Sequence, residues 1–515
     1  MAEVAIAFVG FMAAGKTAAA RAAAAQLGTE AVDTDELIEG ELGESIASVF
    51  EREGEAAFRE REERVCLDVL SRGGVVSLGG GAVTSERIRE ELRRHVVAWC
   101  RIDPELAWER SAGTGRPLAR DRDSFERLYR ERLPLYREVA RAVLPEEHAG
   151  MGARAARWLD TLRELPSVRL AWARSTSGEY PAAVGAGALG LLDDPETRAT
   201  LGAARWFVVG DREALARHRD LLPPTQGVIE VEGGEERKTL AEAEDVLSEL
   251  ARLGVRRDDD LLAFGGGTVG DLAGFCGAVY QRGIPVVQVP TTLVGQVDSA
   301  YGGKTGVDLP AAKNYVGAYH MPAAVLADTR TLSTLPNAEL SAGYVEVLKT
   351  ALIAGGPLWE RVRGMDELDP VQLDDVIFDC ALTKIDVVAA DERDSGRRAV
   401  LNLGHTVGHA IEAATGYSRY RHGEAVGLGL LAALRLSDAG ELRDEVSALL
   451  ERHGLPTSLD DSVTVDEVLA AASLDKKRTA AGLGFVLLSR PGEPREGQHL
   501  DRGSVRKAVE ELRNA

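Results

Sequence analysis

Lysine is scarce in this chain, and its positions suggest where chemistry takes place. Only nine of the 61 basic residues are lysine, and the others are arginine. A compact ammonium on a thin stem cannot be replaced by a planar guanidinium fork where space is tight. Lys507 lies in an amphipathic run typical of ordinary surface. The other eight lie in stretches rich in Gly or in His, Asp and Glu: Lys16, Lys238, Lys304, Lys313, Lys349, Lys384, Lys476 and Lys477. We expect these eight to bind ligands or take part in catalysis.

Lys16 belongs to a phosphate-binding loop. The stretch GFMAAGKT fits the pattern G-x-x-x-x-G-K-[ST] and lies between a strand-like run and an alanine-rich helix. In such a loop the backbone N–H groups and the helix N-terminus cradle phosphates. Lys16 would reach the β- and γ-phosphates, and the Thr17 hydroxyl would bind Mg²⁺. The predicted ATP-binding residues of the loop are Gly10, Ala13, Ala14, Gly15, Lys16 and Thr17.

Polar and glycine-rich segments follow the loop. Asp33 and Asp35 lie at a strand end, where one carboxylate can hold Mg²⁺ and the other can accept a substrate hydroxyl. Two Asp residues there can also simply cap a helix. The glycines at 79–81 allow a close approach of a ligand to the backbone, or form a plain tight turn. The segment 115–118 (GRPL) suits a lid, and the segment 132–136 (RLPLY) offers an anion ligand.

A second set of residues predicts a dinucleotide site. Residues 261–271 read as a strand, a Gly-rich turn and a helix start, which is a pyrophosphate-binding layout without the spaced G-x-G-x-x-G pattern. Upstream, residues 234–238 (GEERK) are suited to the ribose and adenine end. Downstream, the stretch 290–306 carries an isolated Asp298 and Lys304, and Lys313 follows. Apolar packing of a strand does not require these polar residues.

Histidines gather in the C-terminal third. His405 and His409 are spaced i, i+4, so both rings can face one ligand, and spacing alone favours this pair as metal ligands. His422 is a further candidate. Glu346 and Lys349 share one face of a predicted helix, where a surface ion pair is the simpler interpretation.

The elements that position these residues follow an alternating pattern. Apolar runs separated by helical segments predict parallel sheets covered by helices. The predicted strands are residues 4–9, 31–33, 74–78, 96–102, 167–173, 206–209, 261–264, 286–289 and 324–327. From Pro336 onward helical patterns dominate, and only residues 484–488 read as a strand. We therefore expect three domains: 1–165, 166–335 and 336–515.

Composition limits the class of protein. A length of 515 residues suggests roughly two to four domains. A net charge of −21 argues against nonspecific binding to nucleic acid or anionic membranes. The four cysteines are scattered without paired spacing, which favours a reducing compartment. Because no signal peptide or long apolar run is seen, we expect a cytoplasmic protein.

The first third of the chain resembles shikimate kinase. Residues 3–145 carry the stretches GFMAAGKT, VDTDELI, FEREGEAAFREREE, VVSLGGGAV, GRPL and RLPLYREVA in the order of that family. The resemblance implies a P-loop α/β fold and ATP- and Mg²⁺-dependent phosphorylation of the shikimate 3-hydroxyl. One departure is Ala13, where the family usually has glycine; alanine should fit unless the backbone needs a positive φ.

This resemblance implies roles for single residues. Asp35 would lie near the attacking hydroxyl and Arg116 would close over the nucleotide, so Lys16, Asp35 and Arg116 are the predicted catalytic residues. Thr17 and Asp33 would hold Mg²⁺. The implied shikimate ligands are Asp35, Arg59, Gly80, Gly81 and Arg132.

The remainder resembles 3-dehydroquinate synthase. Residues from about 168 to about 500 carry the stretches GGGTVGDLAGF, RGIPVVQVPTTL, VDSAYGGKTGVDLPAAKN, EVLKTALI, LNLGHTVGHAIE, HGEAVGLG and DKK. The resemblance implies an NAD-binding α/β domain, a mostly helical metal-binding domain, and Zn²⁺ or Co²⁺ as the metal. It makes Glu346, His405 and His422 the metal ligands, in place of the pair chosen by spacing. His409 would either support a metal ligand or contact the substrate.

The implied substrate is 3-deoxy-D-arabino-heptulosonate 7-phosphate, which would lose phosphate and close to 3-dehydroquinate. The implied NAD ligands are Glu235, Lys238, Gly266, Gly267, Asp271, Thr291, Thr292, Asp298, Lys304 and Lys313. The implied substrate ligands are Arg282, Asp298, Lys304, Asn314, Lys349, Lys384, Arg398, Asn402, His409, Lys476 and Lys477. Of these, Lys349, Lys384, Arg398, Asn402 and His409 are the predicted catalytic residues.

The leading hypothesis is therefore a bifunctional enzyme of chorismate and aromatic amino acid biosynthesis, dimeric through the synthase half. One alternative is that the second half is another sugar-phosphate cyclase. The other is that one half is a nucleotide-binding regulatory module without catalysis.

Overall fold

The computed structural model describes residues 3–111, 121–146, 150–202, 204–310, 312–476 and 484–513. The chain forms two compact units. Unit 1 contains Met1–Ala173, Pro181–Ala183 and Gly190–Gly202, and unit 2 contains Arg174–Tyr180, Val184–Leu189 and Ala203–Ala515. The chain therefore passes between the units several times after Ala173, downstream of the boundary expected at residue 165. The two units are described separately below.

Unit 1 is built on a parallel sheet. The strands are β1 (Ile6–Val9), β2 (Ala31–Asp33), β3 (Val75–Ser77), β4 (Val96–Cys100), β5 (Ala142–Leu144) and β6 (Arg169–Ser175), whose last residues belong to unit 2. They pair in the order β2-β3-β1-β4-β5-β6. The strands β1, β3, β4 and β5 are buried along their whole length. Such continuous apolar runs are expected when helices cover both faces of a sheet.

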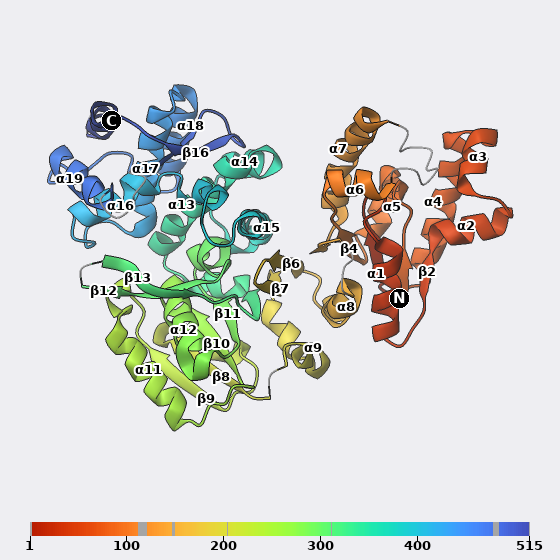
Figure 1. Cartoon of the computed structure of the whole chain (residues 1–515), viewed down its shortest axis with the longest axis horizontal. Helices are drawn as coiled ribbons and strands as arrows, with labels where there is room; N and C mark the ends of the chain where they lie inside the picture. Colours follow the sequence, from red (N-terminus) through yellow and green to blue (C-terminus); the bar gives the residue numbers. More distant parts are fainter. Residues whose placement is uncertain are drawn as a thin grey trace. The chain divides into compact units, whose positions relative to one another are not determined.

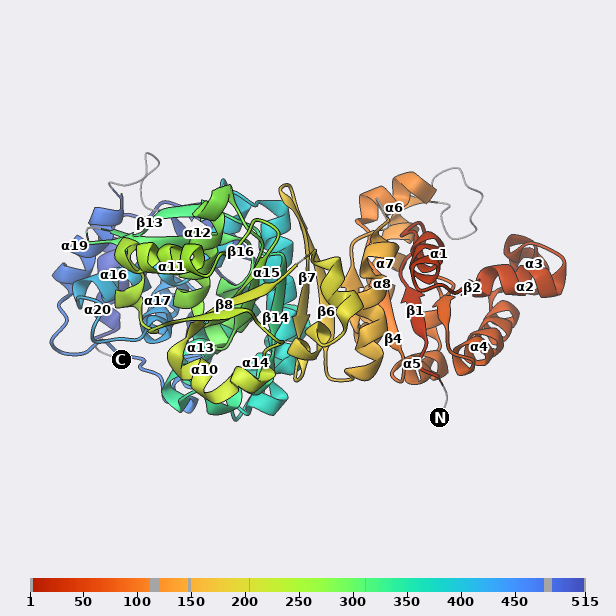
Figure 2. The same ribbon diagram turned by 90° about the horizontal axis from the view of Figure 1, so that it is seen from below.

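The helices of unit 1 are α1 (Lys16–Gln26), α2 (Thr34–Leu42), α3 (Ile46–Glu53), α4 (Glu55–Ser71), α5 (Glu86–Leu92), α6 (Pro104–Ser111), α7 (Arg122–Val139), α8 (Met151–Thr161) and α9 (Pro195–Thr200). Helix α8 packs closely against α1, the helix that follows the phosphate-binding loop (Figure 2). Gly152 makes this approach possible, because a Cβ there would overlap the backbone of Ala19.

Unit 2 contains a run of five parallel strands. Its strands are β8 (Trp206–Asp211), β9 (Gly227–Val231), β10 (Asp260–Gly265), β11 (Val286–Pro290) and β14 (Ala324–Ala327). They pair in the order β9-β8-β10-β11-β14. The strand β7 (Gly178–Val184) is shared between the two units. Two antiparallel hairpins are formed by β12 (Lys304–Leu309) with β13 (Ala312–Tyr319), and by β15 (Phe485–Leu488) with β16 (Pro494–Gln498).

Helices make up most of the rest of unit 2. They are α10 (Arg212–His218), α11 (Leu240–Arg252), α12 (Gly267–Val279), α13 (Asn337–Ala354), α14 (Gly356–Arg363), α15 (Asp374–Ala390), α16 (His405–Ala414), α17 (His422–Leu436), α18 (Gly440–Arg452), α19 (Val465–Lys476) and α20 (Arg502–Glu511). In Figure 1 the sheet region of unit 2 is yellow-green to green, and its helical region is cyan to blue. Among the described residues, no helix is long and apolar enough to cross a bilayer.

The predicted architecture is confirmed, with additions. Every strand predicted from the sequence is present, with ends shifted by a few residues. The strands β5, β7, β9, β12, β13 and β16 were not predicted. Several of these are short or carry polar and glycine residues that break the apolar runs on which strand prediction depends. The hairpin β12–β13 adds antiparallel structure to a region that was expected to alternate strand and helix.

Candidate active sites

The phosphate-binding loop of unit 1 joins β1 to α1. Gly15, with a φ of 81°, is the residue before α1 and allows the turn into the helix. The Lys16 ammonium donates to the Phe11 carbonyl at 3.2 Å, so the side chain lies back along the loop. The Thr17 hydroxyl donates to Asp33 Oδ2 at 2.7 Å. The two groups expected at Mg²⁺ are therefore in direct contact.

Ala13 has a φ of 63°, in the left-handed region. The sequence left open whether this position needs a positive φ; it does, so alanine does not fit here without strain. Holding a residue other than glycine there costs on the order of 1 kcal/mol. Glycine, the residue usual in the resembling family, would adopt this backbone without strain.

Asp33 both caps a helix and faces the loop. Its Oδ1 accepts from the backbone N–H of Asp35 at 3.0 Å and of Glu36 at 3.3 Å, while its Oδ2 accepts from Thr17. The capping interpretation therefore holds for this residue, and its second carboxylate oxygen faces the loop. Asp35 is free of the capping role, and burial raises its pKa to about 6 even though Lys16 acts to lower it. A carboxylate with that pKa is suited to accept a proton near neutral pH.

A cavity of about 390 Å³ lies beside these groups. It is lined by Met12, Lys16, Thr17, Asp33, Asp35, Glu39, Ser45, Ile46, Ala47, Phe50, Phe58, Arg59, Glu62, Ser77, Leu78, Gly80, Gly81 and Arg132. The predicted kinase residues from Lys16 onward that the structure describes therefore line this one cavity. Arg116 lies outside the described residues.

The two arginines of this cavity are held by neighbours. Arg59 pairs with Glu62 at 2.6 Å and with Glu55 at 2.9 Å. Arg132, buried to 4% exposure, donates to the Gly80 carbonyl at 3.1 Å. Both guanidinium groups are therefore oriented before any substrate arrives.

The glycines after β3 leave room for these side chains. A Cβ on Gly79 would come within 2.5 Å of Asp35 Oδ1, and a Cβ on Gly81 would overlap the Arg59 guanidinium. The triple glycine is therefore required because the Asp35 and Arg59 side chains approach this backbone closely, as well as for the turn itself.

Sequence reasoning missed the supporting residues of the kinase cavity. Glu62 is buried and orients Arg59, and the Tyr136 hydroxyl donates to the Gly80 carbonyl at 2.5 Å. The Arg59 guanidinium also lies over the ring of Phe58 at 5.4 Å. The spacing of Phe58, Arg59 and Glu62 on one helix was visible in the sequence, but only Arg59 was assigned a role.

In unit 2, the glycine turn lies at the carboxyl ends of two neighbouring parallel strands. Gly265 of β10 pairs with Pro290 of β11, and the Thr291 N–H donates to the Gly265 carbonyl at 2.9 Å. A Cβ on Gly266 would come within 3.0 Å of the Thr292 side chain. Helix α12 begins at Gly267, so its free N–H groups point at this edge. The turn and the two threonines therefore fit a dinucleotide pyrophosphate.

Charged groups flank the same edge. Lys238 pairs with Asp271 at 2.7 Å, and Glu235 lies 3.3 Å from the Thr268 hydroxyl and 3.5 Å from Lys313 Nζ. Burial raises the pKa of Asp271 to about 6, although Lys238 acts to lower it. The predicted NAD residues on both sides of the turn thus form one connected group.

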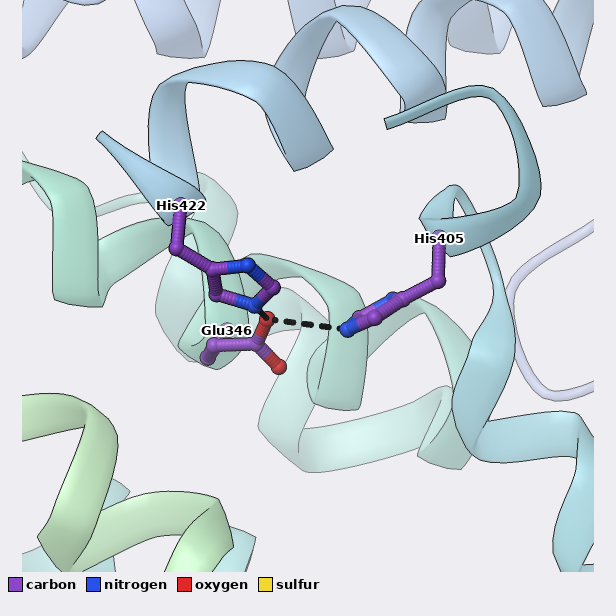
Figure 3. A group of neighbouring side chains, drawn as sticks. All are labelled: Glu346, His405 and His422. Carbon is purple, nitrogen blue, oxygen red and sulfur yellow. Dashed lines mark ion pairs between the residues drawn. The ribbon is translucent and has the colours of Figure 1, made fainter. Parts of the chain in front are cut away.

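Three side chains from three helices form a candidate metal site. Glu346 comes from α13, His405 begins α16 and His422 begins α17, and one ligand atom of each lies within 4.8 Å of the other two. Glu346 Oε1 is 3.5 Å from His405 Nε2 and 3.4 Å from His422 Nε2 (Figure 3). Glu346 is buried to 1% exposure, and His405 Nδ1 lies 3.2 Å from the Leu403 carbonyl. Two imidazoles and one carboxylate fit a divalent ion with open positions.

Two lysines adjoin this site. Lys349 Nζ lies 2.6 Å from Glu346 Oε2 and 3.7 Å from Asp298 Oδ1, and Lys384 Nζ lies 2.7 Å from the same Asp298 oxygen. Burial acts to raise the pKa of Asp298, but Lys349 and Lys384 lower it to about 2. Burial lowers the pKa of Lys384. Asp298 lies in a π-helical turn (Gly295–Ser299), a rare geometry often found at functional sites.

Arg398 and Lys304 are linked to the surrounding loops. Arg398 is buried and donates to the Glu392 carbonyl at 2.5 Å and to the Gly302 carbonyl at 3.1 Å. Lys304 pairs with Asp394 at 2.5 Å. Neither Glu392 nor Asp394 was assigned a role from the sequence.

Several of the predicted substrate residues lie at the surface. Asn314, Asn402 and His409 are exposed, and Arg282 is exposed in a turn with a φ of 71°. Within the described residues, Arg282 and Asn402 have no side-chain hydrogen bond or ion pair. The side chain of Lys476 and the whole of Lys477 lie outside what is described.

The histidine pair chosen by spacing does not fall into one candidate ligand group. The rings of His405 and His409 are 5.2 Å apart, edge to face, but the set that contains His405 is completed by Glu346 and His422. His409 instead belongs to a second group with Glu412 and His422. Glu412 was also missed, because a Glu on a helix gives no signal without the fold.

Comparisons with known proteins agree with this division. Residues 12–163 match the family model for shikimate kinase. Residues 228–342 and 343–478 match those for the N-terminal and C-terminal parts of 3-dehydroquinate synthase. The 3-dehydroquinate synthase of Symbiobacterium thermophilum is 41% identical over 355 residues, which are 65% of this chain and 98% of that protein.

Two solved structures resemble the same part. A 2-deoxy-scyllo-inosose synthase complexed with carbaglucose-6-phosphate, NAD⁺ and Co²⁺ is 25% identical, with a TM-score of 0.58, and the match covers 67% of this chain and 99% of that one. A 2-epi-5-epi-valiolone synthase from Streptomyces hygroscopicus with NAD⁺ and Zn²⁺ bound is 24% identical, with a TM-score of 0.59 and coverage of 65% and 96%, and shows the fold alone. With its N-terminal part in the shikimate kinase family, the chain belongs to the 3-dehydroquinate synthase family.

Proposed function

We propose that the chain catalyses two reactions of the shikimate pathway. Unit 1 transfers the γ-phosphoryl group of ATP to the 3-hydroxyl of shikimate. Unit 2 converts 3-deoxy-D-arabino-heptulosonate 7-phosphate to 3-dehydroquinate and phosphate. The observation that carries this proposal is the presence, in one chain, of a phosphate loop beside an arginine-lined cavity and of a Glu346–His405–His422 set flanked by two buried lysines.

The kinase residues divide into four roles. The backbone of Gly10–Thr17 and the ammonium of Lys16 hold the ATP phosphates, and Thr17 with Asp33 would hold Mg²⁺. Arg59 and Arg132 bind the shikimate carboxylate as oriented forks, a geometry that suits a carboxylate. Asp35 accepts the proton of the attacking hydroxyl, and catalysis is otherwise positioning and charge stabilisation.

The synthase residues hold a small, highly oxygenated substrate. When bound, NAD⁺ supplies a transient oxidation of a substrate alcohol, and Zn²⁺ or Co²⁺ supplies a Lewis acid. Glu346, His405 and His422 would hold the metal ion. Lys349, Lys384 and Arg398 orient the polyol and carboxylate around Asp298, and Lys304 meets the phosphate end. The Gly266–Gly267 turn would hold the NAD⁺ pyrophosphate together with Asp271, Thr291 and Thr292.

The remaining predicted residues complete the same proposal. Arg116 closes over the nucleotide in the kinase reaction. Glu235, Lys238 and Lys313 bind the outer part of NAD⁺. The other substrate contacts are Arg282, Asn314, Asn402, His409, Lys476 and Lys477.

The alternatives are weaker. Another sugar-phosphate cyclase would share the fold, but the identity to the synthase of Symbiobacterium thermophilum, 41%, exceeds the 25% to the inosose synthase. A regulatory module without catalysis would not need Asp35 and Arg132 around a cavity beside the phosphate loop.

The organisation of the protein is also a proposal. Residues 1–165 carry the kinase, residues 166–335 bind NAD⁺, and residues 336–515 bind the metal ion. The chain forms a homodimer through the synthase part, where the exposed apolar residues Leu240 and Val279 offer a contact surface. It works in the cytoplasm, in keeping with four buried cysteine thiols.

Two assays on one purified preparation test the proposal. The first measures phosphate release from the heptulosonate phosphate with NAD⁺, before and after chelation. The second measures shikimate-dependent formation of ADP with Mg²⁺ restored. We expect chelation to abolish the first activity and leave the second intact. Absence of both activities from the untreated chain would sink the proposal, and absence of one would support the reading of that unit as a module without catalysis.

A further inference from the structure

His422 has a carboxylate on each side of its ring. Nε2 lies 3.4 Å from Glu346 Oε1, and Nδ1 lies 3.5 Å from Glu412 Oε2. His405 is arranged in the same sense, with Nε2 toward Glu346 and Nδ1 toward the Leu403 carbonyl. Each histidine of the candidate metal site therefore directs one nitrogen to Glu346 and the other to an oxygen acceptor.

Glu412 is in a position to act as a fixed acceptor. It lies on α16, three residues after His409 and seven after His405, so all three side chains share one face of the helix. Its exposed fraction is 6%, which is low for a glutamate. A buried carboxylate with a ring nitrogen beside it is restrained in a way that a surface glutamate is not.

A second metal ion is the competing explanation for Glu412. His409, Glu412 and His422 also offer ligand atoms within 4.8 Å of one another. A neutral imidazole, however, has one nitrogen with a lone pair and one that carries a proton. If Nε2 of His422 binds an ion beside Glu346, Nδ1 carries the proton and can donate to Glu412 but cannot bind a second ion. The Glu346 side is the more enclosed of the two, since its carboxylate is 1% exposed whereas His409 is exposed.

We infer that Glu412 is a positioning residue that holds His422 as its Nδ1–H tautomer, so that Nε2 faces the metal ion. This inference rests on the proposed metal site at Glu346, His405 and His422. Carboxylates that accept from a metal-ligating histidine fix its orientation and raise its basicity, and their loss typically weakens metal binding about 10- to 100-fold.

Zinc affinity of the full-length chain tests the inference directly. The dissociation constant is measured by competition with a chromophoric chelator for wild type, for Glu412→Gln and for the control Glu424→Gln. Glu424, like His422, lies near the start of α17, but its carboxylate accepts from the Arg421 N–H at 2.8 Å. We expect Glu412→Gln to weaken zinc binding about 10- to 100-fold and the control to change it less than about threefold. The apo forms should share one melting temperature.

A second readout needs no variant. In the zinc-loaded wild-type chain, ¹⁵N shifts of the His422 ring should show a protonated Nδ1 and a metal-bound Nε2. The opposite tautomer would overturn the inference, as would Glu412→Gln binding zinc as tightly as wild type. The number of zinc ions bound per chain is a further outcome. Two ions in the wild type and one in Glu412→Gln would overturn the inference and favour a second metal ion bound by Glu412. A wild-type chain that binds no zinc would overturn the proposed metal site itself.

Discussion

The kinase cavity and the metal centre both handle anionic, polyhydroxylated substrates, but they use different cations. In unit 1, Arg59 and Arg132 are held by a carboxylate and a backbone carbonyl, so each presents an oriented fork. In unit 2, Lys349 and Lys384 converge on the single carboxylate of Asp298. The difference shows that an arginine-rich chain keeps lysine where a compact charge must be buried between other charged groups.

The immediate neighbours of each cation explain the division. Lys349 is 1% exposed and lies between Glu346 and Asp298, two carboxylates that come from different elements. A guanidinium fork would need space and additional acceptors in that gap. The kinase arginines instead line a cavity into which their forks project, and they bind a planar carboxylate there.

The largest effect is expected from Lys349→Met. Removing one partner of a buried charged cluster leaves the other charges uncompensated and costs about 3–5 kcal/mol. We expect synthase kcat/KM to fall about 1,000-fold, the synthase part to lose thermal stability, and kinase activity to stay within about twofold. Kinetics of both reactions and a melting curve measure these outcomes, with Lys507→Met as the surface control. Equal losses in both reactions would mean that the two sites are not independent.

Arg132→Lys should have the next largest effect, on the kinase alone. The Arg132 guanidinium donates to the Gly80 carbonyl and has further N–H groups left to bind a carboxylate. A lysine ammonium cannot present two donors side by side in this way. We expect the KM for shikimate to rise about 10- to 100-fold, the equivalent of about 1.4–2.8 kcal/mol. Arg130→Lys, two residues away on the same helix and exposed in a pair with Glu126, is the matched control. An unchanged KM in Arg132→Lys would contradict the comparison.

The kinase activity should also fall at acid pH, because the Asp35 carboxylate becomes protonated there. Its pKa is raised to about 6 by burial, so protons bind to it as pH falls below that value. A protonated Asp35 cannot accept the hydroxyl proton, so kcat/KM for shikimate should fall about tenfold per pH unit below about 6 and level off above it. A pH profile of the wild type measures this fall. A profile that is flat down to about pH 5 would exclude Asp35 as the base.

Ala13→Gly should have the smallest effect. It relieves a φ of 63° that costs on the order of 1 kcal/mol, but it adds chain entropy to the unfolded state, which offsets about half of that. We expect unit 1 to gain about 0.5 kcal/mol of stability and the KM for ATP to stay within about twofold. Thermal unfolding measures the change in stability, and kinase kinetics at varied ATP concentration measure the KM. A clear loss of stability would show that the strain estimate for this loop is wrong.

Much of the fold and of the local site chemistry could be predicted from the sequence. The phosphate loop and the glycine turn before α12 are each formed by one continuous segment. In each segment a strand, a glycine-rich turn and a helix follow one another in the sequence, so the sequence alone reveals the motif. The pairing of Thr17 with Asp33 could be anticipated because they lie beyond the carboxyl ends of β1 and β2, two strands that flank β3 in one parallel sheet.

What could not be predicted depends on contacts between distant segments. Spacing on α16 favoured His405 with His409, whereas the set that contains His405 needs Glu346 from α13 and His422 from α17. Glu412, Glu392 and Asp394 became visible only when their partners were in place. The positive φ of Ala13 likewise has no signal in the residue itself.

The most direct test of the contrast between the two sites is the synthase activity of Lys349→Arg, with the kinase activity of the same preparation as internal control. This change keeps the charge and alters only its shape. We predict a loss of at least about 100-fold in synthase kcat/KM, about 2.7 kcal/mol, with kinase kcat/KM unchanged. Synthase activity within about threefold of wild type would show that a guanidinium serves as well as an ammonium between Glu346 and Asp298, and would contradict the account.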